Sequence, residues 1–114
     1  MLKIAMVCEK NPEARKRLAQ LLEKHHYLIL ECPDHQTGLC GLTLAPDLII
    51  MHLEPEDLIP CSLVDRLREL LCVLGESRRI FASFQPESCW QKIRALALPC
   101  DGMICLSDII AEAA

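Results

Sequence analysis

Short apolar runs alternate along this chain with segments in which apolar residues recur every three or four positions. Five runs have the length and branched composition of buried strands, at residues 3–8, 27–32, 47–53, 79–84 and 102–106. The helical spacing between them predicts helices over about 12–25, 34–45, 62–74 and 86–98, and a short last helix capped by Ser107. Such alternation predicts a parallel sheet with helices on both faces, because parallel strands are joined by right-handed crossovers.

Capping residues mark several of these boundaries. Asn11 followed by Pro12 predicts the start of the first helix, and Asp34 that of the second. Gly75 predicts the end of the third helix. The inward stripe of the first helix is predicted to be Ala14, Leu18, Leu21, Leu22 and His25, and that of the fourth Trp90, Ile93 and Ala97. Five βα units in this length fit a three-layer flavodoxin-like (βα)5 fold of strand order 2-1-3-4-5, with residues 1–114 as one domain. The short last helix suggests a domain excised from a longer chain.

Composition narrows the class of protein. The 114 residues are 52% hydrophobic and 25% charged, which is typical of one globular domain. No apolar run reaches the roughly 18 residues of a membrane span, and the N-terminus is too short for a signal peptide, so we expect a cytoplasmic protein that binds no membrane. The net charge of −4 leaves no basic footprint for nucleic acid, and we interpret the basic run 15–17 as a solvated helix face.

Eight cysteines are many for this length, but their pattern is that of core residues. None are spaced as Cys-x-x-Cys, so a structural zinc site and a thioredoxin-type motif are not indicated. Cys8, Cys72 and Cys105 lie within apolar patterns, where a free cysteine behaves as a small hydrophobe. We therefore expect reduced thiols and no disulfide framework.

The run from Pro46 to Pro55 carries the most chemical information, because its apolar strand ends on His52 and then enters an acidic loop. This run resembles the third strand of a response-regulator receiver domain, the CheY-like module of bacterial two-component signalling. The resemblance covers the whole chain in element order. In receivers, an aspartate at the position of His52 takes a phosphoryl group, and two acidic residues after the first strand hold magnesium. The positions that match the phosphorylation site of receivers are Cys8, Glu9, His52, Ser83 and Leu106, the last in place of a lysine, and Met103 matches the switch aromatic.

These replacements imply a receiver fold that has lost its phosphorylation chemistry. Magnesium requires oxygen ligands, and Glu9 is the one carboxylate left at the matching positions. Phosphoryl transfer also requires a cation on the developing charge, and Leu106 cannot supply one. Nucleotide-cradling and hydrolase motifs are missing as well. We therefore expect no catalytic residues, no cofactor and no enzymatic activity.

Three functional interpretations remain open. The leading hypothesis is a pseudo-receiver that binds a protein partner or output domain without phosphorylation. Its docking face would combine the fourth helix, fifth strand and fifth helix, with Trp90 and Met103, and would allow a homodimer. The alternative is a metal- or redox-sensing domain in which Cys8, Glu9 and His52 converge, with Cys105 nearby, as zinc or copper ligands or around a thiol of lowered pKa. The third is a residual phospho-signalling receiver, which rests on fold analogy alone. For the site itself, the simplest expectation is a degenerate pocket filled by neutral side chains, with His52 hydrogen-bonded to a loop carbonyl.

Overall fold

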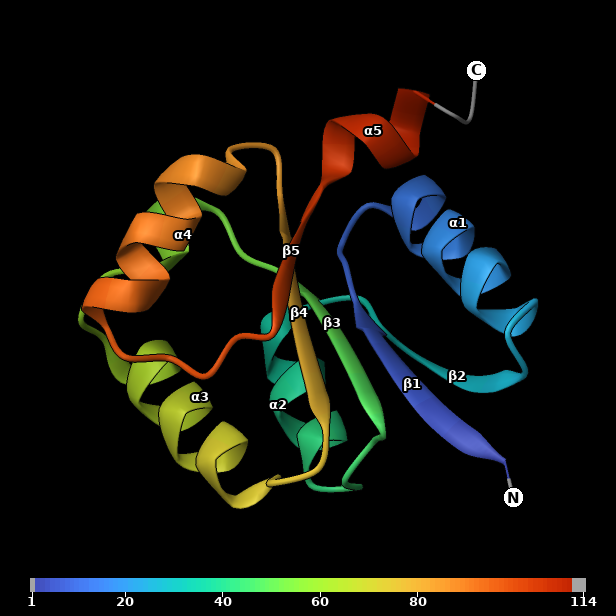
Figure 1. Cartoon of the computed structure of the whole chain (residues 1–114), viewed down its shortest axis with the longest axis horizontal. Helices are drawn as coiled ribbons and strands as arrows, with labels where there is room; N and C mark the ends of the chain where they lie inside the picture. Colours follow the sequence, from blue (N-terminus) through green and yellow to red (C-terminus); the bar gives the residue numbers. More distant parts are fainter. Residues whose placement is uncertain (1, 112–114) are drawn as a thin grey trace.

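Five parallel strands form the central sheet in the order β2-β1-β3-β4-β5 (Figure 1). They are β1 (Lys3–Cys8), β2 (Tyr27–Cys32), β3 (Leu48–His52), β4 (Arg78–Ser83) and β5 (Gly102–Cys105). The computed structural model describes residues 2–111. The predicted flavodoxin-like fold and strand order are therefore confirmed.

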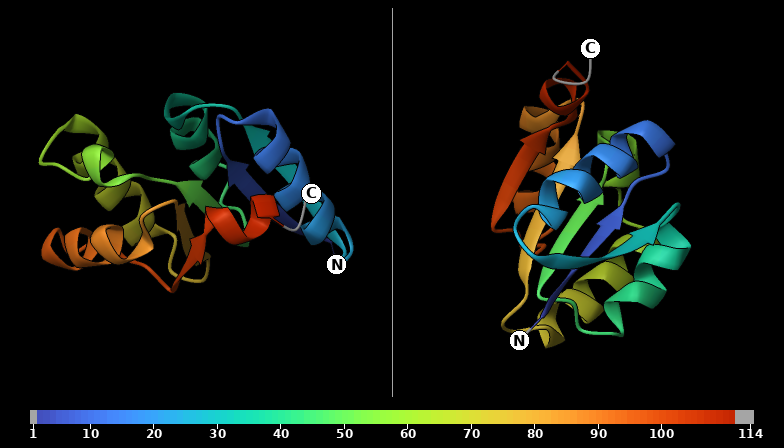
Figure 2. Two further views of the ribbon diagram at one scale, coloured as in Figure 1. Left: turned by 90° about the horizontal axis from the view of Figure 1, so that it is seen from above. Right: turned by 90° about the vertical axis from the view of Figure 1, so that its right-hand side faces the viewer.

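The helices cover both faces of this sheet. They are α1 (Pro12–Glu23), α2 (His35–Leu42), α3 (Ser62–Val73), α4 (Pro86–Ala95) and α5 (Leu106–Ala111), and the turn after β3 forms the short 3-10 helix η1 (Pro55–Asp57). Helices α1 and α5 lie on one face, and α2, α3 and α4 on the other (Figures 1 and 2). None of the helices within residues 2–111 is long and apolar enough to cross a membrane.

Strand alternation divides the apolar side chains between two cores. Met6 and Ile49 pack on the face covered by α2, α3 and α4. Their neighbours Val7 and Ile50 pack on the opposite face, against α1 and α5. This alternation also decides to which side the residues at the strand ends point.

Helix caps agree with the sequence at the start of α1 and α2. The Asn11 side chain accepts hydrogen bonds from the backbone N–H groups of residues 13 and 14, and Pro12 is the first helical residue. Asp34 forms a capping box with Thr37. Helix α3 ends at Val73 with Leu74 as its cap, so Gly75 lies directly after the cap, where a terminating glycine is expected.

Two glycines allow α2 to lie close to β1. A Cβ atom on Gly38 would lie 2.7 Å from Cys8 Sγ, and one on Gly41 would lie 2.8 Å from Met6 Sδ. Both distances are shorter than a carbon–sulfur contact permits. The glycines that weaken α2 as an isolated helix are thus required by its packing.

The predicted inward stripe of α1 is wrong in part. The helix ends at Glu23, and His25 lies beyond it in an exposed turn. Leu21 is exposed, whereas Ala19 is buried. A side chain as small as alanine is a weak sequence signal, so the apolar pattern alone does not fix the orientation of the helix.

The predicted stripe of α4 is also wrong in part. Cys89 and Ile93, four residues apart, are its buried residues. Trp90, about 100° around the helix from Cys89, is 37% exposed, and Ala97 lies in the turn after the helix. Cys89 therefore takes the inward position that the sequence pattern predicted for Trp90.

Strand β5 passes into α5 without a loop. Leu106 is the first helical residue and is buried in the core under α1, so the predicted cap at Ser107 is wrong. Residues 112–114 of the predicted docking face lie outside the described residues.

Candidate functional site

A pocket of about 220 Å³ lies at the carboxyl ends of the central strands, where open α/β sheets place their ligands. Glu9 follows β1, His52 ends β3 and Ser83 ends β4. The residues around the pocket are mostly charged or titratable: Cys8, Glu9, Lys10, Asp34, His35, His52, Glu54 and Asp57. The fold thus brings residues from separate strands to one site.

His52 lies between two carboxylates. Its Nδ1 is 2.8 Å from Glu9 Oε2, and its Nε2 contacts Glu54 Oε2. Glu9 is 2% exposed, and its Oε1 accepts a hydrogen bond from the Asn11 N–H. Its Oε2 meets no aligned donor among the described residues, so the attraction to His52 is an ion-pair contact. Because a buried charge must be compensated, these three side chains form an ionic unit, here called the Glu9–His52–Glu54 triad.

The contacts of His52 and Glu54 favour the charged forms of these two side chains. Burial lowers the pKa of His52, but its contacts with Glu9 and Glu54 have the larger combined effect and raise that pKa above its ordinary 6.5. Burial likewise raises the pKa of Glu54, but hydrogen bonds from Phe84 and Ser83 and the contact with His52 lower it below its ordinary 4.5. His52 is therefore a cation, and Glu54 an anion, across the range between these two values.

Glu54 also connects the triad to the loop between β4 and α4. Ser83 Oγ donates to Glu54 Oε1 at 2.6 Å, and the Phe84 N–H donates to Oε2 at 3.0 Å. Ser83 Oγ in turn accepts the Gln85 N–H at 2.9 Å and the Cys89 thiol at 3.1 Å. The Phe84 ring lies edge-on to His52, with ring centroids 5.7 Å apart. The triad and the start of α4 are thus one hydrogen-bonded network.

Cys8 does not join this network. It pairs with Met51 in the β1–β3 register, so its side chain points to the face opposite that of His52. Its thiol donates to the carbonyl oxygen of Asp34 at 3.2 Å. Burial, with smaller contributions from neighbouring anionic groups, raises the pKa of Cys8 to about 12. The predicted lowering of this pKa by His52 therefore has the wrong sign.

The predicted metal set does not assemble either. Within residues 2–111, no group of three His, Cys, Asp or Glu side chains is arranged to hold a metal. Cys105 lies on β5, two strands away from β3. Both ring nitrogens of His52 face carboxylates, so neither presents a free lone pair. The magnesium of receivers does not fit this site, because the His52 ring lies against the Glu9 oxygen that would have to bind the ion.

The expectation that neutral side chains fill the site and that His52 hydrogen-bonds to a loop carbonyl is also wrong. His52 contacts two carboxylates, and its backbone carbonyl accepts the Nε2–H of His35 at 2.9 Å. Of the other predicted positions, Ser83 joins the network and Leu106 is buried in the core. Sequence reasoning missed Glu54. The available signal was its place two residues after His52, where an extended chain returns side chains to the same side.

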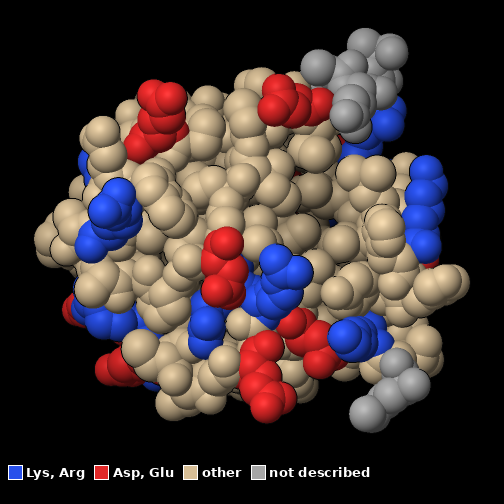
Figure 3. Space-filling view, in the orientation of Figure 1, with Lys and Arg blue, Asp and Glu red and all other residues tan. Residues whose placement is uncertain are grey.

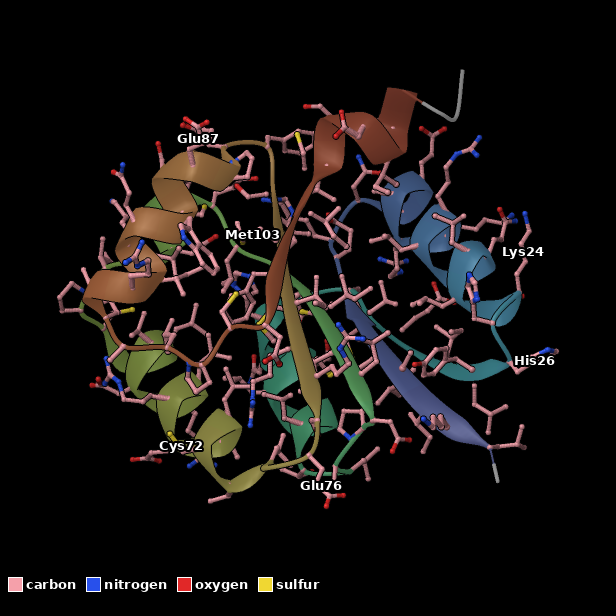
Figure 4. All side chains as sticks on the ribbon, in the orientation of Figure 1. Lys24, His26, Cys72, Glu76, Glu87 and Met103 are labelled. Atoms are coloured by element: carbon pink, nitrogen blue, oxygen red, sulfur yellow. The ribbon has the colours of Figure 1, made fainter. Side chains whose placement is uncertain are left out.

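A second hollow lies between α4 and β5, the α4–β5 groove, with a volume of about 550 Å³. Its residues are Pro86, Glu87, Trp90, Gln91, Arg94, Gly102 and Met103. Figure 4 shows Met103 on β5 at the side of α4, and Glu87 at the start of that helix. The structure therefore brings together Trp90 and Met103, the two predicted docking residues.

Known structures share this fold. A CheY-like response regulator from Mesorhizobium loti superposes with a TM-score of 0.68 and 14% identity over 100% of both chains. A response regulator from Thermotoga maritima gives a TM-score of 0.69 and 11% identity over 91% of this chain and 84% of its own. A third response regulator, from Burkholderia pseudomallei, with a phosphorylated aspartic acid, calcium ion and citrate, gives a TM-score of 0.63. Its sequence identity is 17% over 98% of this chain and 73% of its own. No family model and no curated protein matches the chain. At these identities the likeness shows a receiver-like fold.

Proposed function

We propose that this receiver-like domain is a signalling module that acts by binding protein, without phosphorylation and without enzymatic activity. The shared fold of response regulators supports the receiver-like part of the proposal. The observation that supports the rest is the Glu9–His52–Glu54 triad, which lies where the resemblance to receivers implies the phosphorylation site.

The chemistry of the triad opposes phosphoryl transfer. A histidine attacks phosphorus through a free ring lone pair, and both nitrogens of His52 face carboxylates. Glu9 and Glu54 would repel an incoming phosphoryl group, and the buried Leu106 offers no cation for its charge. Phosphorylation would therefore require the triad to break.

The α4–β5 groove is the surface that we assign to protein binding. An exposed tryptophan beside a hollow is the kind of residue that dominates binding energy at interfaces. Partners in this proposal are an output domain, another signalling protein or a second copy of this chain.

The charges of α4 favour the second copy. Glu87, Trp90, Gln91 and Arg94 share one face of the helix, and all four are exposed. Figure 3 shows acidic atoms near the start of α4 and basic atoms farther along it. If two copies pack their α4 helices antiparallel about a two-fold axis, Glu87 of each faces Arg94 of the other, with Trp90 near the axis.

Two further features belong to the proposal. We place the protein in the cytoplasm, because Cys8, Cys32 and Cys89 are free thiols packed in the core. We treat residues 1–114 as a single domain.

The deciding experiment is an amide NMR titration with magnesium and beryllofluoride, a mimic of the phosphoryl group. We expect no shift at Glu9, His52 or Ser83. The response regulator from Burkholderia pseudomallei, whose structure holds a phosphorylated aspartic acid, provides a positive control. Saturable shifts centred on those three residues would show that the pocket still accepts a phosphoryl group, and phosphorylation independence would then be wrong.

A further inference from the structure

Two hydrogen-bond donors at the end of β4 converge on a carboxylate of the chain itself. Ser83 Oγ and the Phe84 N–H bind the two oxygens of Glu54 at 2.6 and 3.0 Å, and His52 contacts Oε2. A hydroxyl, a backbone N–H and an imidazole nitrogen around one carboxylate form the arrangement that proteins use to bind oxyanions. We propose that Ser83, Phe84 and His52 form an oxyanion site that Glu54 occupies as a tethered ligand.

The segment that carries Glu54 is itself held in place. The Glu54 N–H donates to Asp57 Oδ2 at 2.9 Å, and the Asp57 N–H donates to the Glu54 carbonyl at 2.9 Å. Lys92 Nζ, from α4, donates to the Pro55 carbonyl at 3.2 Å. Because its backbone is fixed beside the two donors, the Glu54 carboxylate is present at a high effective concentration and excludes small anions from solution.

Occupancy of this site orders the start of α4. Gln85, the residue before the helix, forms no side-chain cap. Its N–H is instead bound by Ser83 Oγ, which also accepts the Cys89 thiol. Trp90 follows Cys89 directly, so the tethered anion stabilises the part of α4 that carries the α4–β5 groove. Glu54 thereby stabilises the start of the helix.

This inference rests on the proposed function for its biological meaning, because a permanently occupied oxyanion site would make a signalling module independent of phosphorylation.

The site itself is tested separately. Glu54→Ala in the full chain removes the ligand, and amide hydrogen exchange then reports on Phe84 and Gln85. We expect exchange about 10- to 100-fold faster at both, since hydrogen bonds to charged groups are among the stronger ones. Glu56→Ala, which removes an exposed carboxylate from the same turn, is the matched control and should leave both rates unchanged.

Acetate is the probe for the vacated site. In Glu54→Ala, acetate should restore slow exchange at Phe84 and Gln85 in a saturable manner, whereas the neutral isostere acetamide should not. In the unaltered protein, acetate should have no effect. Unchanged exchange in Glu54→Ala, or equal effects of acetate and acetamide, would overturn the inference.

A conservative variant keeps the test decisive if Glu54→Ala does not fold. Glu54→Gln retains the shape and an acceptor oxygen but removes the charge, so exchange at Phe84 should still accelerate. Exchange at the original rate would show that the anion is not required. A failure of acetate to bind would leave the beryllofluoride test of phosphorylation independence unaffected, and beryllofluoride binding would leave the acetate result unaffected.

Discussion

Glu9 and His52 form a buried ion pair in which Oε2 lies 2.8 Å from Nδ1 at the carboxyl ends of β1 and β3. Removal of the imidazole by His52→Gln leaves the Glu9 carboxylate buried without its cation, and we expect a loss of about 3 kcal/mol in the free energy of unfolding. Urea denaturation followed by circular dichroism measures it. The exposed His25→Gln is the control.

A double-mutant cycle separates this pair from other effects of the substitution. Glu9→Gln together with His52→Gln should lose less than the sum of the single variants, because the uncompensated charge is gone. Strict additivity would mean that the two side chains are not coupled.

The titration of His52 and Glu54 predicts a stability optimum in mildly acidic solution. The pKa of His52 is raised in the folded state, so its contribution is complete below its ordinary 6.5 and is lost as the pH rises through the raised value. The pKa of Glu54 is lowered, so its contribution is complete above its ordinary 4.5 and is lost as the pH falls through the lowered value. Each loss has a slope of up to about 1.4 kcal/mol per pH unit. Urea denaturation at a series of pH values measures both losses of stability. The His52→Gln variant should lack the loss that occurs as the pH rises.

Thiol labelling tests the redox interpretation. Cys40 and Cys72 are exposed and should react first with a disulfide reagent. The pKa of Cys8 is about 12 against an ordinary 9.0, so its thiolate fraction at neutral pH is smaller by roughly a thousandfold, and it should react last. Mass spectrometry of quenched samples gives the order. Labelling of Cys8 as fast as that of Cys40 would reopen the redox hypothesis.

Charge reversal on α4 tests the second copy as partner. Glu87→Arg and Arg94→Glu each place like charges opposite one another twice in a two-fold dimer, and each variant alone should dimerise at least about tenfold more weakly. A mixture of the two variants restores opposite charges at both contacts and should form a heterodimer. Analytical ultracentrifugation measures the association, and the single tryptophan of the chain, Trp90, reports it by fluorescence. A mixture that associates no better than either variant alone would exclude this geometry.

Close packing between α2 and β1 gives a further prediction. Gly38→Ala should cost about 1–3 kcal/mol in the free energy of unfolding, despite the better helix propensity of alanine, because the new Cβ would overlap Cys8 Sγ. Gly75→Ala, where a Cβ meets no atom of residues 2–111 within 4 Å, is the control and should change stability little. Thermal or urea denaturation compares the two.

The architecture could be predicted from the sequence because its signals are local. Periodicity separated five strands from five helices, and Asn11 and Asp34 marked helix starts that the structure confirms. Strand ends also brought Glu9, His52 and Ser83 to one edge of the sheet, since all strands run in the same direction.

The face to which each side chain points was decided only by the tertiary structure. The sequence predicted that Cys8 lies with His52 and that Trp90 points inward. A shift of one residue hardly changes an apolar pattern, but it moves a side chain to the other face of a strand and turns it by about 100° around a helix. The role of Glu54 depends on the path of a loop and on the distance between β3 and β4, neither of which is a local property. The sequence by itself thus determined the elements and their order. Inter-strand register and loop geometry determined which charges meet, because long-range contacts depend on how the elements pack.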